Sequence, residues 1–116
     1  MKKVLIIDDE EDICLLLKAY LQKNNFTVNY AMNLTEGLTA IQKNTPDTVI
    51  LDNNLPDGLG INKIDNIKSN FPETQVIMIS AMTSLQSKAL NKGADFFVPK
   101  PFKLSHISQL IHPNSL

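Results

Sequence analysis

Short runs of apolar residues recur along this chain and alternate with segments whose apolar residues have helical spacing. Five runs, at 3–7, 27–30, 48–51, 75–79 and 96–98, predict strands. The first, third and fourth runs contain almost no polar residue. Such continuous apolar runs are typical of strands that are buried on both faces of a parallel sheet.

The segments between and after these runs predict five helices. Their apolar stripes are Ile13, Leu16, Leu17, Tyr20 and Leu21; Leu34, Leu38 and Ile41; Ile61, Ile64 and Ile67; Leu85, Ala89 and Leu90; and Leu104, Ile107, Leu110 and Ile111. Asn33 can cap the second helix, with Glu36 three residues later. Gly93 is suited to end the fourth helix, and Pro113 to end the fifth. Residues 53–60 are rich in turn formers and predict a loop.

Strands that alternate with helices predict an α/β protein with a doubly wound parallel sheet. The chain has 116 residues, which is the length of one ordinary domain, so we expect a single domain over residues 1–116.

Composition narrows the classes of partner. The net charge of −1 argues against nucleic acid as a direct partner, because phosphate binding needs a basic face. No apolar run approaches the roughly 20 residues of a membrane span. The one cysteine, Cys14, fits a reducing cytoplasm and has the ordinary interpretation of a small apolar residue under a helix.

Polar residues follow the predicted strands at one edge of the sheet. Asp8 and Asp9 follow the first strand, Asp52 the third, Ser80 the fourth and Lys100 the fifth. In open parallel sheets, sites form outside the carboxyl ends of the strands, where the strand order reverses. If the first and third strands are neighbours, the three aspartates share one pocket.

Crowded carboxylates need a neutralising partner. Two such charges 4 Å apart repel by about 4 kcal/mol at an effective dielectric constant near 20. A proton, the lysine or a divalent cation would offset this repulsion, and oxygen ligands suit Mg²⁺. A carboxylate can also act as a nucleophile toward phosphorus. Asp52 is the best candidate, since it stands between the ends of the first and fourth strands.

Each residue also has an ordinary interpretation. The acids at 8–12 could begin a helix, Asp52 could be a turn residue, Ser80 could simply follow a strand, and Lys100 could be a surface lysine. Two other classes share the pattern. A hydrolase with an aspartate nucleophile usually carries a second acid where this chain has Asn54. A flavodoxin-like cofactor binder needs a phosphate loop rich in Gly, Ser and Thr after the first strand.

Four stretches make the chain resemble a receiver domain of the two-component response regulators. They are VLIIDDE, VILDNNLPDG, VIMISA and GADFFVPKPF, and the resemblance extends from residue 3 to residue 111. In length and layout the chain is similar to the stand-alone, chemotaxis-regulator type. The resemblance implies a flavodoxin-like (βα)5 sheet with strand order 2-1-3-4-5.

The resemblance also implies roles for individual residues. Asp52 would accept the phosphoryl group. Asp9, Asp52 and the backbone carbonyl of Asn54 would ligate Mg²⁺, with Asp8 acting through water. Lys100, Ser80 and Ala81 would contact the phosphoryl group, Ser80 and Phe97 would form the switch, and the Lys100–Pro101 peptide bond would be cis.

The partners implied are a sensor histidine kinase or phosphotransfer protein and a downstream target protein, read out through the fourth helix, fifth strand and fifth helix. The domain would catalyse its own phosphotransfer and dephosphorylation without being a turnover enzyme. The short last helix lacks arginine, so we expect a monomer or a weak homodimer. The chain is either a stand-alone receiver or a receiver cut from a longer protein, and a degenerate receiver is the remaining alternative.

Overall fold

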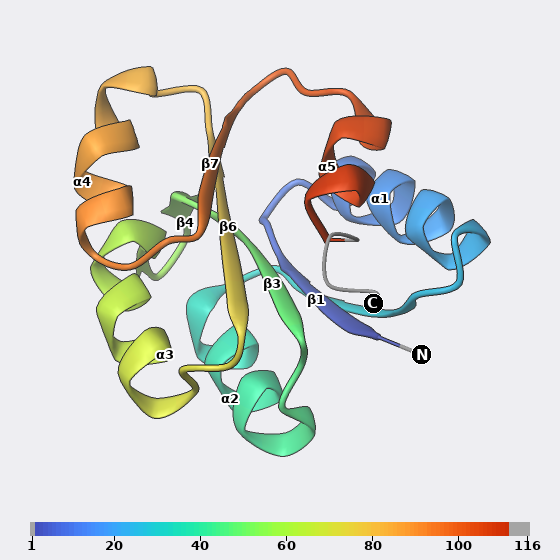
Figure 1. Ribbon diagram of the computed structural model, residues 1–116, viewed down its shortest axis with the longest axis horizontal. Coiled ribbons are helices and arrows are strands. Elements are labelled where there is room, and N and C mark those ends of the chain that lie inside the picture. The colour runs from blue at the N-terminus through green and yellow to red at the C-terminus, as the bar shows by residue number, and fades with distance from the viewer. Residues whose placement is uncertain (1, 112–116) are drawn as a thin grey trace.

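The computed structural model describes residues 2–111 and is built around a parallel sheet of five strands (Figure 1). These strands are β1 (Lys3–Ile7), β2 (Thr27–Ala31), β3 (Thr48–Asp52), β6 (Gln75–Ser80) and β7 (Phe96–Pro99). They lie in the order β2-β1-β3-β6-β7. Counted within this sheet alone, the order is 2-1-3-4-5, which confirms the predicted fold class and strand order.

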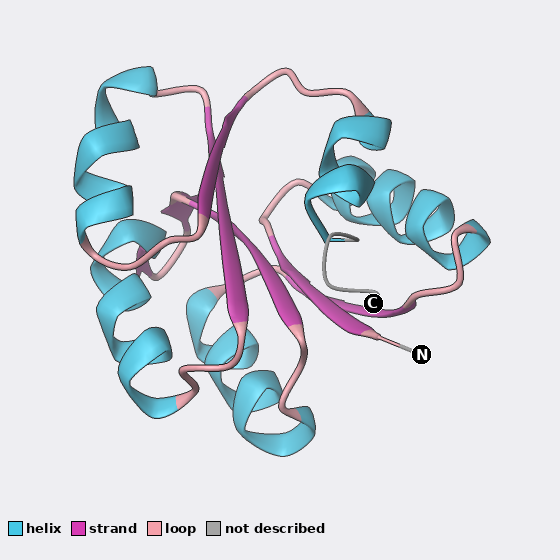
Figure 2. Cartoon of the chain, in the orientation of Figure 1, coloured by secondary structure: helices cyan, strands magenta, loops and turns pink. Residues whose placement is uncertain are grey.

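The helices cover both faces of the sheet. Helices α1 (Glu11–Lys23) and α5 (Leu104–Ile111) lie on one face, and α2 (Leu34–Asn44), α3 (Ile64–Asn70) and α4 (Gln86–Asn91) lie on the other (Figures 1 and 2). Within residues 2–111, no helix is both long and apolar enough to cross a lipid bilayer.

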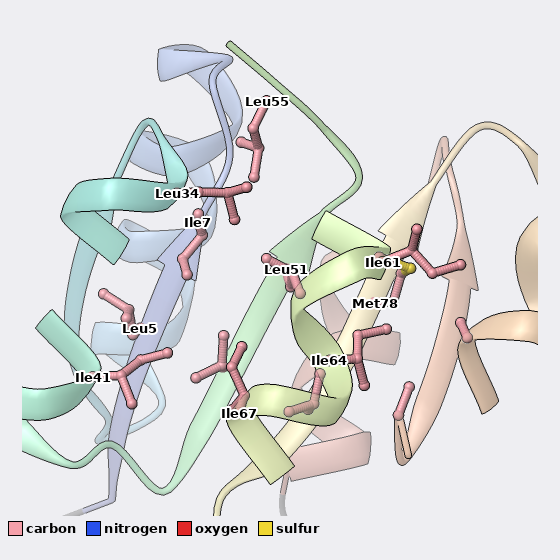
Figure 3. Close-up of a cluster of buried hydrophobic side chains, with 14 residues drawn as sticks. Leu5, Ile7, Leu34, Ile41, Leu51, Leu55, Ile61, Ile64, Ile67 and Met78 are labelled. Atoms are coloured by element: carbon pink, nitrogen blue, oxygen red, sulfur yellow. The ribbon is translucent and has the colours of Figure 1, made fainter. Parts of the chain in front are cut away.

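Alternate strand residues supply two separate cores. Leu5 and Ile7 of β1 pack on the side of α2 and α3, as Figure 3 shows, whereas Val4 and Ile6 pack on the side of α1 and α5. The same alternation runs through β3 and β6. Each fully buried isoleucine or leucine stabilises the fold by about 1.5–3 kcal/mol. This two-sided burial is the reason why the strands appear in the sequence as continuous apolar runs.

The segment predicted as a loop at residues 53–60 contains a short antiparallel hairpin. Strand β4 (Asn54–Leu55) pairs with β5 (Gly58–Leu59), and a 3₁₀ turn (Gly60–Lys63) then leads into α3. Leu55 is buried in the core below α2 and α3, which holds the hairpin against the domain. Gly58 has a φ of 152°, a value that residues with a Cβ rarely adopt.

Two residues predicted on core-facing stripes point toward solvent instead. In α1 the buried positions are Cys14, Leu17 and Leu21, while Leu16 is 58% exposed. Successive residues of a helix are 100° apart, so Leu16 lies at the edge of the helix face that carries the buried Leu17. In α4, Ala89 is buried and Leu90 is exposed. Pro113, the predicted end of the last helix, lies outside the described residues.

Candidate functional site

Two buried aspartates stand at the carboxyl ends of neighbouring strands. Asp8 follows β1 and is 0% exposed, and Asp52 is the last residue of β3 and is 5% exposed. Strands β1 and β3 are paired in the sheet, and the order of strands reverses between them. The predicted crowding of carboxylates at the switch point is therefore present for Asp8 and Asp52.

The Lys100 side chain lies between these carboxylates. Its Nζ is 3.1 Å from Asp8 Oδ2 and 3.4 Å from Asp52 Oδ1. The Lys100 backbone N–H donates to the carbonyl oxygen of Ser80 at the end of β6, over 3.0 Å. The Lys100–Pro101 peptide bond is cis, the isomer that the resemblance implies. One ammonium group thus bridges two buried carboxylates from strands far apart in the sequence.

Glu10 is a third partner of Lys100 that the sequence did not single out. Its Oε1 lies 3.0 Å from Lys100 Nζ, and its backbone N–H donates to Asp8 Oδ1 over 2.8 Å. In the sequence, only its place in the run of acids at 8–12 points to Glu10, and that run is also typical of the start of a helix. Glu10 in fact precedes α1 and turns back toward the lysine.

Burial and mutual repulsion shift the pKa values of the site. Burial, followed by the charge of Asp8, raises the pKa of Asp52 to about 6, although Lys100 opposes this shift. Burial also raises the pKa of Asp8 against the opposing effects of the Glu10 N–H and Lys100. Although burial acts to lower it, the pKa of Lys100 is raised, because the ammonium donates to Glu10 and lies beside Asp52 and Asp8. Further positive charge would therefore be favourable here.

The remaining predicted metal ligands lie on two neighbouring segments. Carboxylate oxygens of Asp8, Asp9 and Glu10 come within 4.8 Å of one another, and Asp9 is exposed. Asn54 belongs to β4, two residues after Asp52. All of these side chains and carbonyls offer hard oxygen donors, so the set fits Mg²⁺ rather than a metal that prefers sulfur or imidazole.

Neither predicted switch residue has a side-chain hydrogen bond to the acidic cluster among residues 2–111. Ser80 is buried at the end of β6, and its Oγ accepts from the Met82 N–H over 3.0 Å. Phe97 of β7 is half-buried and packs against the core shared with α3 and α4. The ring is thus in contact with apolar side chains, while the Ser80 hydroxyl is committed to the loop that follows its own strand.

Ala81 lies on the wall of a pocket beside the site. The pocket has a volume of about 410 Å³ and reaches from α1 to the segment between β7 and α5; its lining is Glu10, Ile13, Leu16, Leu17, Ala81, Lys100, Pro101, Phe102 and Leu104. The exposed Leu16 belongs to this lining. The pocket joins an apolar surface directly to Lys100, which contacts Asp52, and to Glu10, which contacts Lys100.

A second set of contacts fixes the backbone next to Asp52. The Asn53 side-chain oxygen accepts from the Ile61 N–H over 3.0 Å, and the Asn53 carbonyl accepts from the Gly60 N–H over 2.8 Å. A Cβ on Gly60 would collide with the carbonyl oxygen of Asp52. The chain therefore returns closely against the end of β3, which a residue larger than glycine would prevent.

The fold and the site together define a class of protein. It is a doubly wound α/β domain with two buried aspartates and a lysine at the switch point of its sheet. The family model of the response regulator receiver domain matches residues 4–112. The chain belongs to this family, which favours a receiver over the flavodoxin-like cofactor binder and the hydrolase.

Individual relatives agree with the assignment. The chain is 35% identical over 112 residues to the response regulator protein PilR of Pseudomonas aeruginosa, and 36% identical over 109 residues to the KDP operon transcriptional regulatory protein KdpE of Escherichia coli. These alignments cover 95% and 92% of this chain but only 25% of PilR and 48% of KdpE. The chain thus spans less than half of the length of these relatives.

Solved structures share the fold over nearly the whole chain. The beryllofluoride-activated NtrC4 receiver domain dimer is similar with a TM-score of 0.89 and 37% identity, covering 96% of this chain and 93% of that one. A two-component response regulator from Clostridium difficile is similar with a TM-score of 0.90 and 27% identity, at the same coverages.

Proposed function

We propose that this receiver domain accepts a phosphoryl group on Asp52 and passes the signal on as a change of shape. One observation carries the proposal: the Lys100 ammonium contacts two buried carboxylates, Asp8 and Asp52, at the switch point of the sheet. A buried acidic pair beside a lysine is unfavourable to maintain for stability alone. It suits a site that receives a charged group.

Asp52 is the group that reacts. With a pKa of about 6, its carboxylate is mostly ionised at neutral pH and can act as a nucleophile. An Asp52 oxygen forms a bond to phosphorus while the bond between phosphorus and the donor's histidine nitrogen breaks. The donor would be a sensor histidine kinase or a phosphotransfer protein, as the family assignment supports.

The remaining residues would bind the charge that arrives. Asp9, Asp52 and the Asn54 carbonyl would hold Mg²⁺, with Asp8 acting through water, and the ion would supply positive charge to the phosphoryl oxygens. Lys100 would leave its carboxylate partners for one of those oxygens. The Ser80 hydroxyl and the Ala81 N–H would donate to others.

The outgoing signal would use α4, β7 and α5. A Ser80 hydroxyl drawn toward the phosphoryl group gives up its contact with the Met82 N–H. The half-buried Phe97 ring could then move inward, and burying it would be worth a few kcal/mol at most, enough to shift a two-state equilibrium. Leu90 and Phe96 are exposed on this surface and suit a downstream target protein. Self-catalysed transfer and loss of the phosphoryl group would make the domain a switch rather than a turnover enzyme.

The proposal is tested by incubating the protein with Mg²⁺ and a small acyl phosphate and then measuring its intact mass. The wild type should gain the mass of one phosphoryl group, and Asp52→Asn should gain nothing. Asp47→Asn, at an exposed aspartate just before the start of β3, is the matched control and should behave as the wild type does. A wild type that stays unmodified would identify a degenerate receiver, and equal modification of Asp52→Asn would refute the assignment of Asp52.

The pocket beside the site gives a prediction for docking of the protein donor. A donor must bring its histidine close to Asp52, and the apolar pocket that Leu16 lines adjoins that carboxylate through Lys100. We expect Leu16→Glu to slow phosphotransfer from a phosphorylated histidine kinase by about tenfold or more, because it places a charge in an apolar contact. Its reaction with the small acyl phosphate should be unchanged.

Leu15→Glu is the control for this prediction. Leu15 is the neighbouring exposed leucine, at 48% exposure, and it does not line the pocket. Both variants should fold equally well. Equal slowing of the two variants would mean that the pocket has no special part in docking.

A further inference from the structure

Asp57 forms an unusual set of contacts at the tip of the β4–β5 hairpin. Its Oδ1 accepts from the Leu34 N–H over 2.8 Å, and its Oδ2 accepts from the Thr35 N–H over 2.9 Å and the Thr35 hydroxyl over 2.8 Å. Leu34 and Thr35 are the first two residues of α2. The carboxylate therefore joins the turn after the phosphoacceptor strand to the N-terminus of a helix that precedes that strand.

Helix α2 already has its own cap. Asn33 accepts from the Glu36 N–H over 2.8 Å, which is the ordinary role of an N-cap residue. Asp57 takes the two earlier amides, where the partial positive charge of the helix end also favours a carboxylate. Hydrogen bonds from those amides lower the pKa of Asp57, so its charge is retained at neutral pH. This second cap thus connects the β4–β5 hairpin to the N-terminus of α2.

Besides the buried Leu55 side chain, the hairpin is held by a short ladder and by contacts at its base and tip. It contains two residue pairs, Asn54 with Leu59 and Leu55 with Gly58, and isolated ribbons of this size are unstable in water. Asn53 fixes its base through Ile61 and Gly60. Asp57 fixes its tip. Asn54, whose carbonyl belongs to the proposed magnesium site, lies between these two anchors.

We propose that Asp57 is a positioning residue that holds the Asn54 carbonyl in place for Mg²⁺ by anchoring the hairpin to α2. The inference rests on the proposed function, because it requires that Mg²⁺ binds next to Asp52. Partners that orient ligand groups without touching the metal commonly change metal affinity by 10- to 100-fold when removed. Binding couplings are reciprocal, so Mg²⁺ should in turn strengthen the contact between Asp57 and α2.

The test compares Mg²⁺ affinities, measured from amide chemical shifts during a titration. Asp57→Ala should bind Mg²⁺ about tenfold more weakly than the wild type. Asn33→Ala removes the other cap of the same helix, and Glu36→Ala removes a carboxylate from the same helical turn. Both controls should stay within about twofold of the wild type, because Asn33 bonds to Glu36 within its own helix and neither substitution removes the link between α2 and the hairpin. A purely structural cap would make Asp57→Ala and Asn33→Ala equivalent.

A second readout uses the wild type alone. Exchange of the Leu34 and Thr35 amide hydrogens should slow on addition of Mg²⁺ by more than exchange of the Glu36 amide, which Asn33 caps. If Asp57→Ala does not fold, Asp57→Asn keeps an acceptor for Leu34 and loses the one for Thr35, so it should weaken binding by a smaller factor.

The outcomes separate the two proposals. Wild-type protein that fails to bind Mg²⁺ overturns the proposed site and the role of Asp57 together. Wild-type binding that Asp57→Ala and Asp57→Asn both retain in full overturns only the role of Asp57.

Discussion

Replacing Lys100 by methionine is expected to lower the free energy of unfolding by about 3 kcal/mol at pH 7. The ammonium contacts Asp8, Asp52 and Glu10, and the first two carboxylates are buried. Methionine retains most of the side-chain volume, so the loss reports the missing charge rather than a cavity. Two buried carboxylates would remain at neighbouring strand ends with no cation between them.

The pH dependence separates this cause from simple misfolding. Asp52 takes up a proton more readily than an ordinary aspartate, with a pKa of about 6, so repulsion in the variant should weaken in mild acid. The deficit measured by urea denaturation should therefore shrink between pH 7 and about pH 5. Lys103→Met, at an exposed lysine three residues later, should cost little. A deficit that does not vary with pH, or one shared with Lys103→Met, would contradict the explanation.

Replacing Asp52 by asparagine is expected to do the opposite and stabilise the fold by about 2–3 kcal/mol at pH 7. The pKa of Asp52 in the folded protein, about 6, is above its ordinary value of 3.8, so the folded state holds this proton more tightly than the unfolded state does. The carboxyl group therefore costs nothing below the lower value. The ionised carboxylate becomes progressively unfavourable for folding as the pH rises from 3.8 to about 6, and its full cost is present above about pH 6.

Denaturation curves across this interval give the check. The difference between Asp52→Asn and the wild type should be near zero around pH 4 and reach its maximum above about pH 6. Asp9→Asn changes the net charge equally at an exposed neighbouring position and serves as the control. An Asp52→Asn variant that is less stable than the wild type at neutral pH would show that this carboxylate supports the fold instead of straining it.

The sheet could be predicted because its strands are buried on both faces. Continuous branched runs such as 3–7 and 75–79 have no solvent face to carry polar residues, so they stand out from the amphipathic helices. The strand-end rule then located Asp8, Asp52 and Lys100 at one edge, and the structure brings these three side chains into contact.

Other features depend on contacts that local patterns do not encode. Glu10 turns toward Lys100 because residue 100 lies next to it in space, although the two are 90 positions apart in the sequence. The hairpin at 54–59 depends on Leu55 reaching the core and on Asp57 reaching α2. Leu16 has the spacing of a core residue, but α1 turns Cys14 and Leu17 toward the sheet instead. Tertiary packing decides each of these cases.

We expect the negative charge of the Asp52 carboxylate to be unfavourable until added positive charge neutralises it. An NMR titration of the Asp52 side-chain carbon, with and without Mg²⁺, tests this most directly. We expect a pKa of about 6 for Asp52 in the metal-free protein and a fall of about one unit or more in saturating Mg²⁺. A pKa at the ordinary aspartate value that does not respond to Mg²⁺ would contradict this expectation.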